Sequence, residues 1–170
     1  CNTAHGFGAL KNNTTGVYNT ALGWGAACSN TTGSSNVSIG WASLHLQSSG
    51  NSNTAIGIYS QFASNGCCNV SIGNETLMCN TTGVANTASG WCALKCNTTG
   101  YCNTAFGYIA LSKNTSGILN SSLGSWSLFS NTTGNQNSVL GYAALHCNTT
   151  GSCNTALGYN ALYYSVGANM

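Results

Sequence analysis

The sequence predicts an all-β fold, a parallel β-solenoid (β-roll) of about ten 17-residue coils with two short strands in each coil. The first observation behind this prediction is a glycine that recurs every 17 residues, with a single step of 16. The second is an asparagine four residues before each of these glycines. Such fixed-period similarity is typical of stacked repeats, in which each unit packs mainly on its neighbours. The glycines are Gly6, Gly23, Gly40, Gly57, Gly73, Gly90, Gly107, Gly124, Gly141 and Gly158.

Aligned on the asparagine, one unit reads NTALGYxALxxNTTGxx, and its positions are numbered here from 1 to 17. Like positions stack on one another in a solenoid, so position 1 predicts a structural asparagine ladder with amide hydrogen bonds between coils. The ladder consists of Asn2, Asn19, Asn36, Asn53, Asn69, Asn86, Asn103, Asn120, Asn137 and Asn154. We expect residues 1–170 to form one repetitive domain of ten units without caps. At about 4.8 Å per coil, its length is roughly 50 Å.

The sequence predicts the same elements, in the same order, in every unit. Positions 1 to 5 favour an extended segment that ends at the glycine, and positions 8 and 9, a small residue followed usually by leucine, favour a second short strand. The NTTG stretch at positions 12 to 15 supplies turn residues, since glycine readily adopts positive φ. Positions 3, 4, 8 and 9 are all small or apolar, although successive strand residues face opposite ways. Either both faces of a flat coil are packed, or a second chain covers the outer face.

The composition excludes several classes of function. The chain has four charged residues and no arginine, whereas nucleic-acid binding needs clusters of basic side chains. No apolar run approaches the ~20 residues of a membrane helix. We expect no metal, no cofactor and no enzymatic activity, because Glu75 is the only carboxylate and the histidines lie in well-separated units. These histidines are His5, His45 and His146.

Ten cysteines indicate an oxidising, secretory compartment and hence a secreted, extracellular protein. In CNTTGYC and CNTTGSC, cysteine occupies positions 11 and 17 of one unit, and a turn between them predicts the disulfides Cys96–Cys102 and Cys147–Cys153. A zinc site is the alternative, but it needs four ligands at one point. Cys68 and Cys79 could bridge across coils. The remaining cysteines have no evident partner: Cys1, Cys28, Cys67 and Cys92.

Twelve Asn-x-Ser/Thr sequons occur, and seven of them fall at position 12, in the predicted turn. An exposed turn is accessible to a glycosyltransferase, so covalent N-linked glycans are expected there. These seven asparagines are Asn13, Asn30, Asn80, Asn97, Asn114, Asn131 and Asn148. Two further candidates, Asn12 and Asn74, lie outside this position, whereas Asn36, Asn69 and Asn120 belong to the position 1 ladder and should stay bare if it is buried. The alternative is that NTTG only provides turn chemistry.

Position 6 is aromatic in seven units and forms an aromatic stripe: Phe7, Trp24, Trp41, Trp91, Tyr108, Tyr142 and Tyr159. Its spacing matches that of the stacked walls, which favours packing in the core or at an interface. The alternative is a platform on which sugar rings stack.

The segments NTAFGYIAL (103–111), NSVLGYAAL (137–145) and NTALGYNAL (154–162) resemble the head repeats of trimeric autotransporter adhesins and related phage tail-fibre proteins. The resemblance extends over the whole chain. It implies a left-handed parallel β-roll, usually trimeric, that mediates attachment to surfaces. The chain departs from this family in its longer repeat, its many cysteines and its dense sequons.

These features together favour a structural subunit of an extracellular glycosylated fibre or appendage, with open terminal coils that pair head to tail between copies of the chain. Lateral self-association is also expected from the apolar positions on both strand faces. The first alternative is an adhesin or a viral or phage fibre shaft that binds surface carbohydrate. The second is an ice-binding solenoid, suggested by threonine at position 2 in six units.

Overall fold

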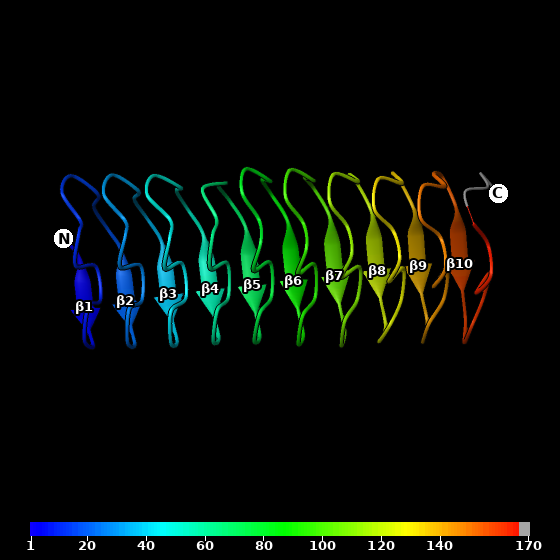
Figure 1. The fold of residues 1–170 in the computed structure, drawn as a ribbon, viewed down its shortest axis with the longest axis horizontal. Coiled ribbons are helices and arrows are strands. Elements are labelled where there is room, and N and C mark those ends of the chain that lie inside the picture. Colours follow the sequence, from blue (N-terminus) through cyan, green and yellow to red (C-terminus); the bar gives the residue numbers. More distant parts are fainter. Residues whose placement is uncertain (167–170) are drawn as a thin grey trace.

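The computed structural model describes residues 1–166 and shows a rod of stacked coils (Figure 1). One parallel sheet runs along the rod, its ten strands ordered β1 to β10 as in the sequence. This confirms the predicted all-β parallel solenoid with 17-residue spacing. The strands are β1 (Thr3–His5), β2 (Thr20–Leu22), β3 (Val37–Ile39), β4 (Thr54–Ile56), β5 (Val70–Ile72), β6 (Thr87–Ser89), β7 (Thr104–Phe106), β8 (Ser121–Leu123), β9 (Ser138–Leu140) and β10 (Thr155–Leu157).

The coils are numbered 1 to 10 by the strand that each contains. Equivalent positions pair in register, as in Thr87 with Thr104, and the register continues through the shorter coil 4 (residues 53–68), where Ile56 pairs with Ile72. Coil 4 lacks position 14, so the missing residue is absorbed in the turn and not in the strand. The last four residues of the predicted tenth unit, 167–170, lie outside the described part of the chain.

The second strand predicted in each coil is wrong, because the described residues contain one strand per coil. Positions 7 and 9 adopt the left-handed backbone conformation, as at Cys92 (φ 56°) and Leu94 (φ 51°). Two left-handed residues so close together bend the chain repeatedly and prevent an extended segment. Neighbouring coils are nevertheless joined here by backbone hydrogen bonds, such as that from Leu94 N to Ala110 O at 3.0 Å.

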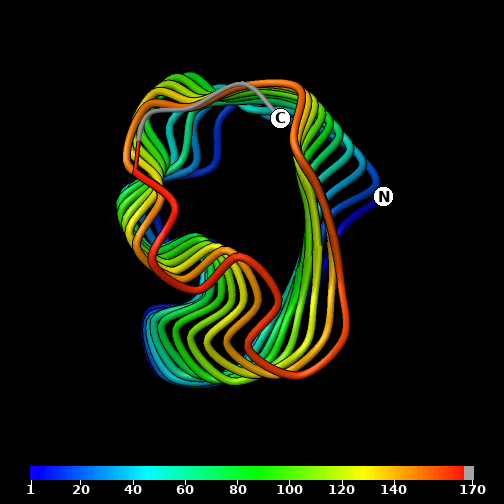
Figure 2. The ribbon, with the colours of Figure 1, turned by 90° about the vertical axis from the view of Figure 1, so that its right-hand side faces the viewer.

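The interior of the rod is filled by positions 3, 8 and 9. Viewed along the rod, the successive coils follow nearly the same closed outline (Figure 2). A column of leucines at position 9 is fully buried from coil 5 to coil 9, and small residues at positions 3 and 8 pack against it: Leu77, Leu94, Leu111, Leu128 and Leu145. Stacking identical side chains therefore gives this part of the chain one continuous hydrophobic column.

The column is interrupted in coil 4, where Gln61 replaces the leucine. The buried apolar residues accordingly form two clusters, one ending at Ala55 and the other beginning at Leu77. Gln61 is fully buried, and its Oε1 has no hydrogen-bond partner, although Nε2 donates to Thr54 O at 3.0 Å and to Ser71 Oγ at 2.9 Å. Coil 4 is therefore a seam between two better-packed halves of the rod.

Strand residues at positions 2 and 4 face outward. Position 4 carries a row of aliphatic and aromatic side chains that remain substantially exposed, including Leu22, Ile72, Phe106, Leu123, Leu140 and Leu157. In this single chain, only the inward face of strands β2 to β10 is packed. That a second chain covers the outward face stays a prediction. Within residues 1–166, no helix is long and apolar enough to cross a membrane.

The glycine at position 5 is required by the close stacking of the coils. Gly107 has φ +135°, and a Cβ added there would lie 2.6 Å from the carbonyl carbon and oxygen of Gly124 in the next coil. Because these neighbours are backbone atoms of a paired coil, they have little freedom to move away. The recurrent glycine that reveals the period in the sequence is thus a point of close approach between coils.

Candidate functional site

The asparagines that recur at positions 1 and 12 of the repeat form two buried columns of side-chain amides. In the position 1 ladder, each asparagine links two coils: Asn103 Nδ2 donates to Asn86 Oδ1 at 3.1 Å and to Gly117 O at 2.8 Å. Its Oδ1 accepts from the backbone N of Asn120 at 3.0 Å and from Asn120 Nδ2 at 3.1 Å. Every member from Asn19 to Asn154 is buried. This confirms the predicted asparagine ladder.

Position 12 forms a second ladder that the sequence reasoning missed. Asn114 Nδ2 donates to Asn97 Oδ1 at 2.7 Å, and Asn97 Nδ2 donates to Asn80 Oδ1 at 2.8 Å. Each side chain also donates within its own coil to the glycine carbonyl three residues later, as Asn97 does to Gly100 O at 2.9 Å. The signal for this ladder in the sequence is the asparagine that begins NTTG at a constant position, which we expected to lie in an exposed, glycosylated turn.

The glycine at position 15 joins the two ladders. Gly117 O accepts hydrogen bonds from both Asn103 Nδ2 and Asn114 Nδ2, at 2.8 and 2.9 Å. A Cβ on Gly117 would lie 2.3 Å from Asn114 Oδ1, so no side chain fits. In a water-excluded interior, each such amide hydrogen bond is stronger than in water, and each unmade one is costly.

The expectation that position 12 is an exposed turn is wrong. Six of the seven predicted glycosylation sites have fully or almost fully buried side chains: Asn30, Asn80, Asn97, Asn114, Asn131 and Asn148. A glycan is attached through Nδ2, which here points into the rod and is hydrogen-bonded, so the folded coil has no room for it. The seventh, Asn13 in coil 1, is half-buried, and its Nδ2 donates to Gly16 O.

Two of the five sequons outside position 12 are accessible. Asn12 and Asn74 are both exposed. The position 1 sequons Asn36, Asn69 and Asn120 are buried. Burial is the condition under which we expected them to stay without glycans. The prediction of N-linked glycans therefore survives in the folded chain only at Asn12 and Asn74.

The position 12 ladder is broken at the seam. Gln47 and Ser64 replace asparagine in coils 3 and 4. Gln47 Nε2 donates to Gly50 O at 2.7 Å and leaves Asn30 Oδ1 buried without a partner, while Asn80 Nδ2 donates to Ser64 Oγ at 3.1 Å. The hydrogen-bonded column is thus interrupted in the same part of the rod where the leucine column is interrupted.

All ten cysteines are free, and the predicted bridges Cys96–Cys102 and Cys147–Cys153 are absent. The NTTG stretch does not turn back on itself: the amides of Thr98, Thr99 and Gly100 all donate to Thr115 O of the next coil. The backbone between positions 11 and 17 is therefore hydrogen-bonded to the next coil. The same geometry applies to Cys68 and Cys79, which are also unbridged.

A small polar cluster lies on the surface of coils 5 and 6. Lys95 Nζ is 2.6 Å from Glu75 Oε2, and the Cys92 thiol donates to the same oxygen at 3.4 Å. The hydrogen bond from Lys95 lowers the pKa of Glu75. Burial, together with the bond to Glu75, raises the pKa of the Cys92 thiol to about 11. In the described part of the chain, no three His, Cys, Asp or Glu side chains are placed to hold a metal ion.

The aromatic stripe lies on the surface of the chain, so packing in the core is wrong, and packing at an interface stays a prediction. Its rings are 41% to 78% exposed and stack on one another along the rod. Trp24 and Trp41 have centroids 5.2 Å apart with an interplanar angle of 18°, and Tyr142 and Tyr159 are 5.4 Å apart at 11°. Within each stack the ring faces are covered by neighbouring rings, so the stacked segments offer mainly edges to a sugar.

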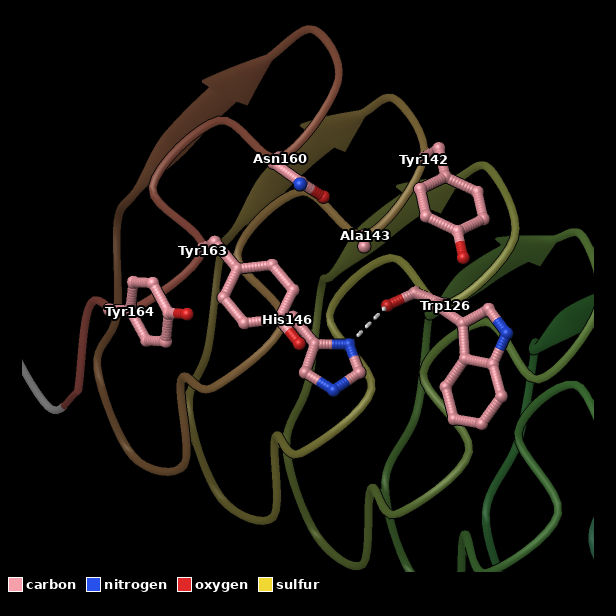
Figure 3. Close-up of a pocket in the computed structure, with 7 residues that line it drawn as sticks. All are labelled: Trp126, Tyr142, Ala143, His146, Asn160, Tyr163 and Tyr164. Atoms are coloured by element: carbon pink, nitrogen blue, oxygen red, sulfur yellow. Dashed lines mark hydrogen bonds between the residues drawn. The ribbon is translucent and has the colours of Figure 1, made fainter.

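One pocket, of about 690 Å³, opens beside the stripe in coils 8 to 10 (Figure 3). Small or polar residues at position 7, Ala143 and Asn160, leave space between Tyr142 on one side and His146 and Tyr163 on the other. His146 Nδ1 lies 3.2 Å from Trp126 O, which fixes the imidazole beside the indole. The lining residues are Trp126, Tyr142, Ala143, His146, Asn160, Tyr163 and Tyr164.

No protein-family profile, no curated protein and no solved structure matches this chain. The resemblance to the head repeats of trimeric autotransporter adhesins therefore stays a prediction drawn from the repeat motif alone.

Proposed function

We propose that this chain is a structural segment of an extracellular fibre, in which it serves as a rigid shaft. The observation that carries the proposal is the pair of asparagine ladders joined at the position 15 glycine. The asparagines that recur at positions 1 and 12 connect one coil to the next: Asn103 Nδ2 donates to Asn86 Oδ1, and Asn114 Nδ2 donates to Asn97 Oδ1. The proposal includes no enzymatic activity, since the single carboxylate, Glu75, is paired with Lys95.

End-to-end growth follows from the same geometry. Within the described residues, the edge strands β1 and β10 each pair on one side only. An open strand edge presents backbone groups that readily pair with another strand. A further coil of this repeat, in the same polypeptide or in a second copy, has the matching spacing and side chains. Self-association through the exposed position 4 row is the lateral component of the proposal.

The glycan component of the proposal is narrower than the sequence suggested. Sugars at Asn12 and Asn74 would project from the surface without disturbing either ladder, because both asparagines are exposed. With so few charges, the remaining hydration of the rod must come from neutral groups. The threonines at position 14 supply some of it, since Thr82, Thr99 and Thr133 are all exposed.

Electron microscopy over a range of protein concentrations tests the proposal. We expect unbranched filaments that lengthen with concentration and keep the width of one coil or a small bundle of coils. Circular dichroism of the same sample must show a folded β structure. Folded particles that remain short at every concentration would refute end-to-end growth, and compact particles would refute the rod itself.

Carbohydrate binding is a second candidate function, favoured by the pocket in coils 8 to 10. Its walls combine aromatic rings with the polar groups of Asn160 and the tyrosines, a composition typical of sites for neutral sugars. Calorimetric titration with neutral oligosaccharides tests it, with Trp126→Ala expected to abolish binding. The control Trp91→Ala alters an exposed ring of the stripe outside the pocket. Equal loss in both variants, or no binding, would exclude this function.

A further inference from the structure

Two of the ten cysteines occupy the same position in consecutive coils. Cys79 is position 11 of coil 5, and Cys96 is position 11 of coil 6. No other two cysteines in the sequence are related in this way. The pairs considered from the sequence joined position 11 to position 17, whereas the solenoid brings together residues that share a position.

The backbone holds these two residues in stacking register. Cys79 N donates to Lys95 O, the carbonyl directly before Cys96, at 3.0 Å. Cys96 N donates in turn to Ser112 O at 2.9 Å, so the same coil-to-coil contact repeats. Hydrogen-bonded strands lie about 4.8 Å apart. This spacing falls within the ~4.4 to 6.8 Å between Cα atoms that a disulfide requires.

Both thiols lie at the surface boundary, where a small oxidant can reach them. Each cysteine is half-buried, and both are free thiols. Burial, and to a lesser extent the neighbouring Cys96, raises the pKa of the Cys79 thiol. This coupling is consistent with two thiols that lie side by side. The raised pKa leaves less of the reactive Cys79 thiolate at neutral pH, and this fraction grows as the pH rises.

We propose that Cys79 and Cys96 are an oxidisable pair that forms a disulfide between coils 5 and 6. The oxidant is a small-molecule disulfide such as oxidised glutathione. The thiolate of one cysteine attacks a glutathione sulfur and expels one glutathione thiolate. The second cysteine thiolate then attacks the protein sulfur of the mixed disulfide and expels the other. The two cysteine thiols are oxidised, one glutathione disulfide is reduced, and the two released thiolates take up the two protons.

Cys92 is the competing partner, since it lies four residues before Cys96 in the same coil. Its thiol is buried and donates to Glu75 Oε2. Its pKa of about 11 leaves almost no thiolate at neutral pH. Cys147 supplies a matched control, because it also occupies position 11 but stacks between Ser130 and Tyr164.

The bridge would close a loop of one coil next to the seam. Restricting the unfolded chain in this way stabilises the folded state. For a loop of this length we expect the thermal midpoint of the oxidised chain to rise by roughly 5 to 10 °C. The bridge would therefore stabilise the beginning of the better-packed half of the rod that follows coil 4.

The test incubates the folded, full-length chain with oxidised glutathione, blocks free thiols with N-ethylmaleimide, and maps peptides by mass spectrometry without reduction. We expect a linked peptide pair containing Cys79 and Cys96, with the loss of two hydrogen atoms from the intact mass. In C96S, Cys79 should carry glutathione or N-ethylmaleimide, whereas C147S should bridge like the wild type. Hydrogen exchange before and after oxidation must show that each variant is folded. Alkylation of both cysteines in the folded chain, or a link to Cys92 or Cys102, would overturn the proposal.

Discussion

Replacement of Asn103 by alanine tests how much the buried ladder contributes to stability. Its side chain is fully buried and makes four hydrogen bonds, two donated to Asn86 and Gly117 and two accepted from Asn120. Alanine removes all four and leaves the carbonyl of Gly117 and the amides of Asn120 with fewer partners. At a net ~0.5 to 1.5 kcal/mol for each bond, the loss is about 2 to 6 kcal/mol.

Asn2→Ala is the matched control. Asn2 occupies the same position in coil 1, donates to Gly16 O and accepts from Asn19 N, but it is exposed. Water can replace these contacts, so we expect a loss of at most about 1 kcal/mol. The difference between the two losses in free energy of unfolding measures the effect of burial separately from the chemistry of the asparagine side chain.

Guanidinium unfolding followed by tryptophan fluorescence measures both losses, and hydrogen exchange at β7 and β8 locates them. Repeat arrays can unfold in parts, so the exchange data decide whether the loss is local. We expect a large loss for Asn103→Ala, with exchange increased mainly in coils 6 to 8. If Asn103→Ala and Asn2→Ala cost the same within about 0.5 kcal/mol, the ladder is not the main connection between coils.

Four further predictions follow from single features of the rod. Gly107→Ala, whose Cβ would meet the backbone of the next coil, should lower the free energy of unfolding by more than about 3 kcal/mol in guanidinium titrations. Gly8→Ala, whose Cβ would lie 3.9 Å from its nearest neighbour, Gly25 Cα, should cost only about 1 kcal/mol, and equal losses would contradict the stacking argument. Because the pKa of Glu75 is lowered from 4.5, its contact with Lys95 should stabilise the chain above pH 4.5 and be lost as the pH falls through the lowered value. Thermal midpoints should therefore drop more in the wild type than in Glu75→Gln on acidification, and parallel curves would count against this. Site mapping before and after glycosidase treatment should find Asn97 bare, and a glycan there would contradict its burial. Backbone amide hydrogen exchange should be faster around Gln61 than in coils 6 to 9, and equal protection in both regions would contradict the interpretation of coil 4 as a seam.

The period alone sufficed to predict the solenoid, the parallel stacking and the position 1 ladder. A repeat this short places like residues above one another, so an invariant asparagine must meet its own copies. The number of strands was not predictable in the same way. Leu94 and Leu111 are usual strand or helix residues, and nothing in their identity shows that they adopt φ 51°. Ala27 and Gln61, which stand in place of the leucine, have φ 48°, so this conformation belongs to the repeated path of the backbone and not to the identity of the residue.

The direction of the NTTG side chains was also beyond the sequence. Asparagine, threonine and glycine are turn residues by propensity, and Asn97 satisfies the sequon pattern. Its burial depends on an acceptor, Gly100 O, and on the asparagines above and below, which together satisfy an amide in the interior. The cysteine pairing was mispredicted for a related reason. Cys96–Cys102 and Cys147–Cys153 were predicted from spacing within one unit, whereas a solenoid brings together residues that share a position in successive units.

A cryo-electron microscopy reconstruction of the assembled protein, at a resolution that separates side chains, tests the central claim most directly. We expect coils that continue at constant spacing along the filament, with the position 1 and position 12 asparagines inside and glycan density, if any, only at Asn12 and Asn74. Glycans on position 12 asparagines such as Asn97, or coils that do not stack along the filament axis, would contradict it.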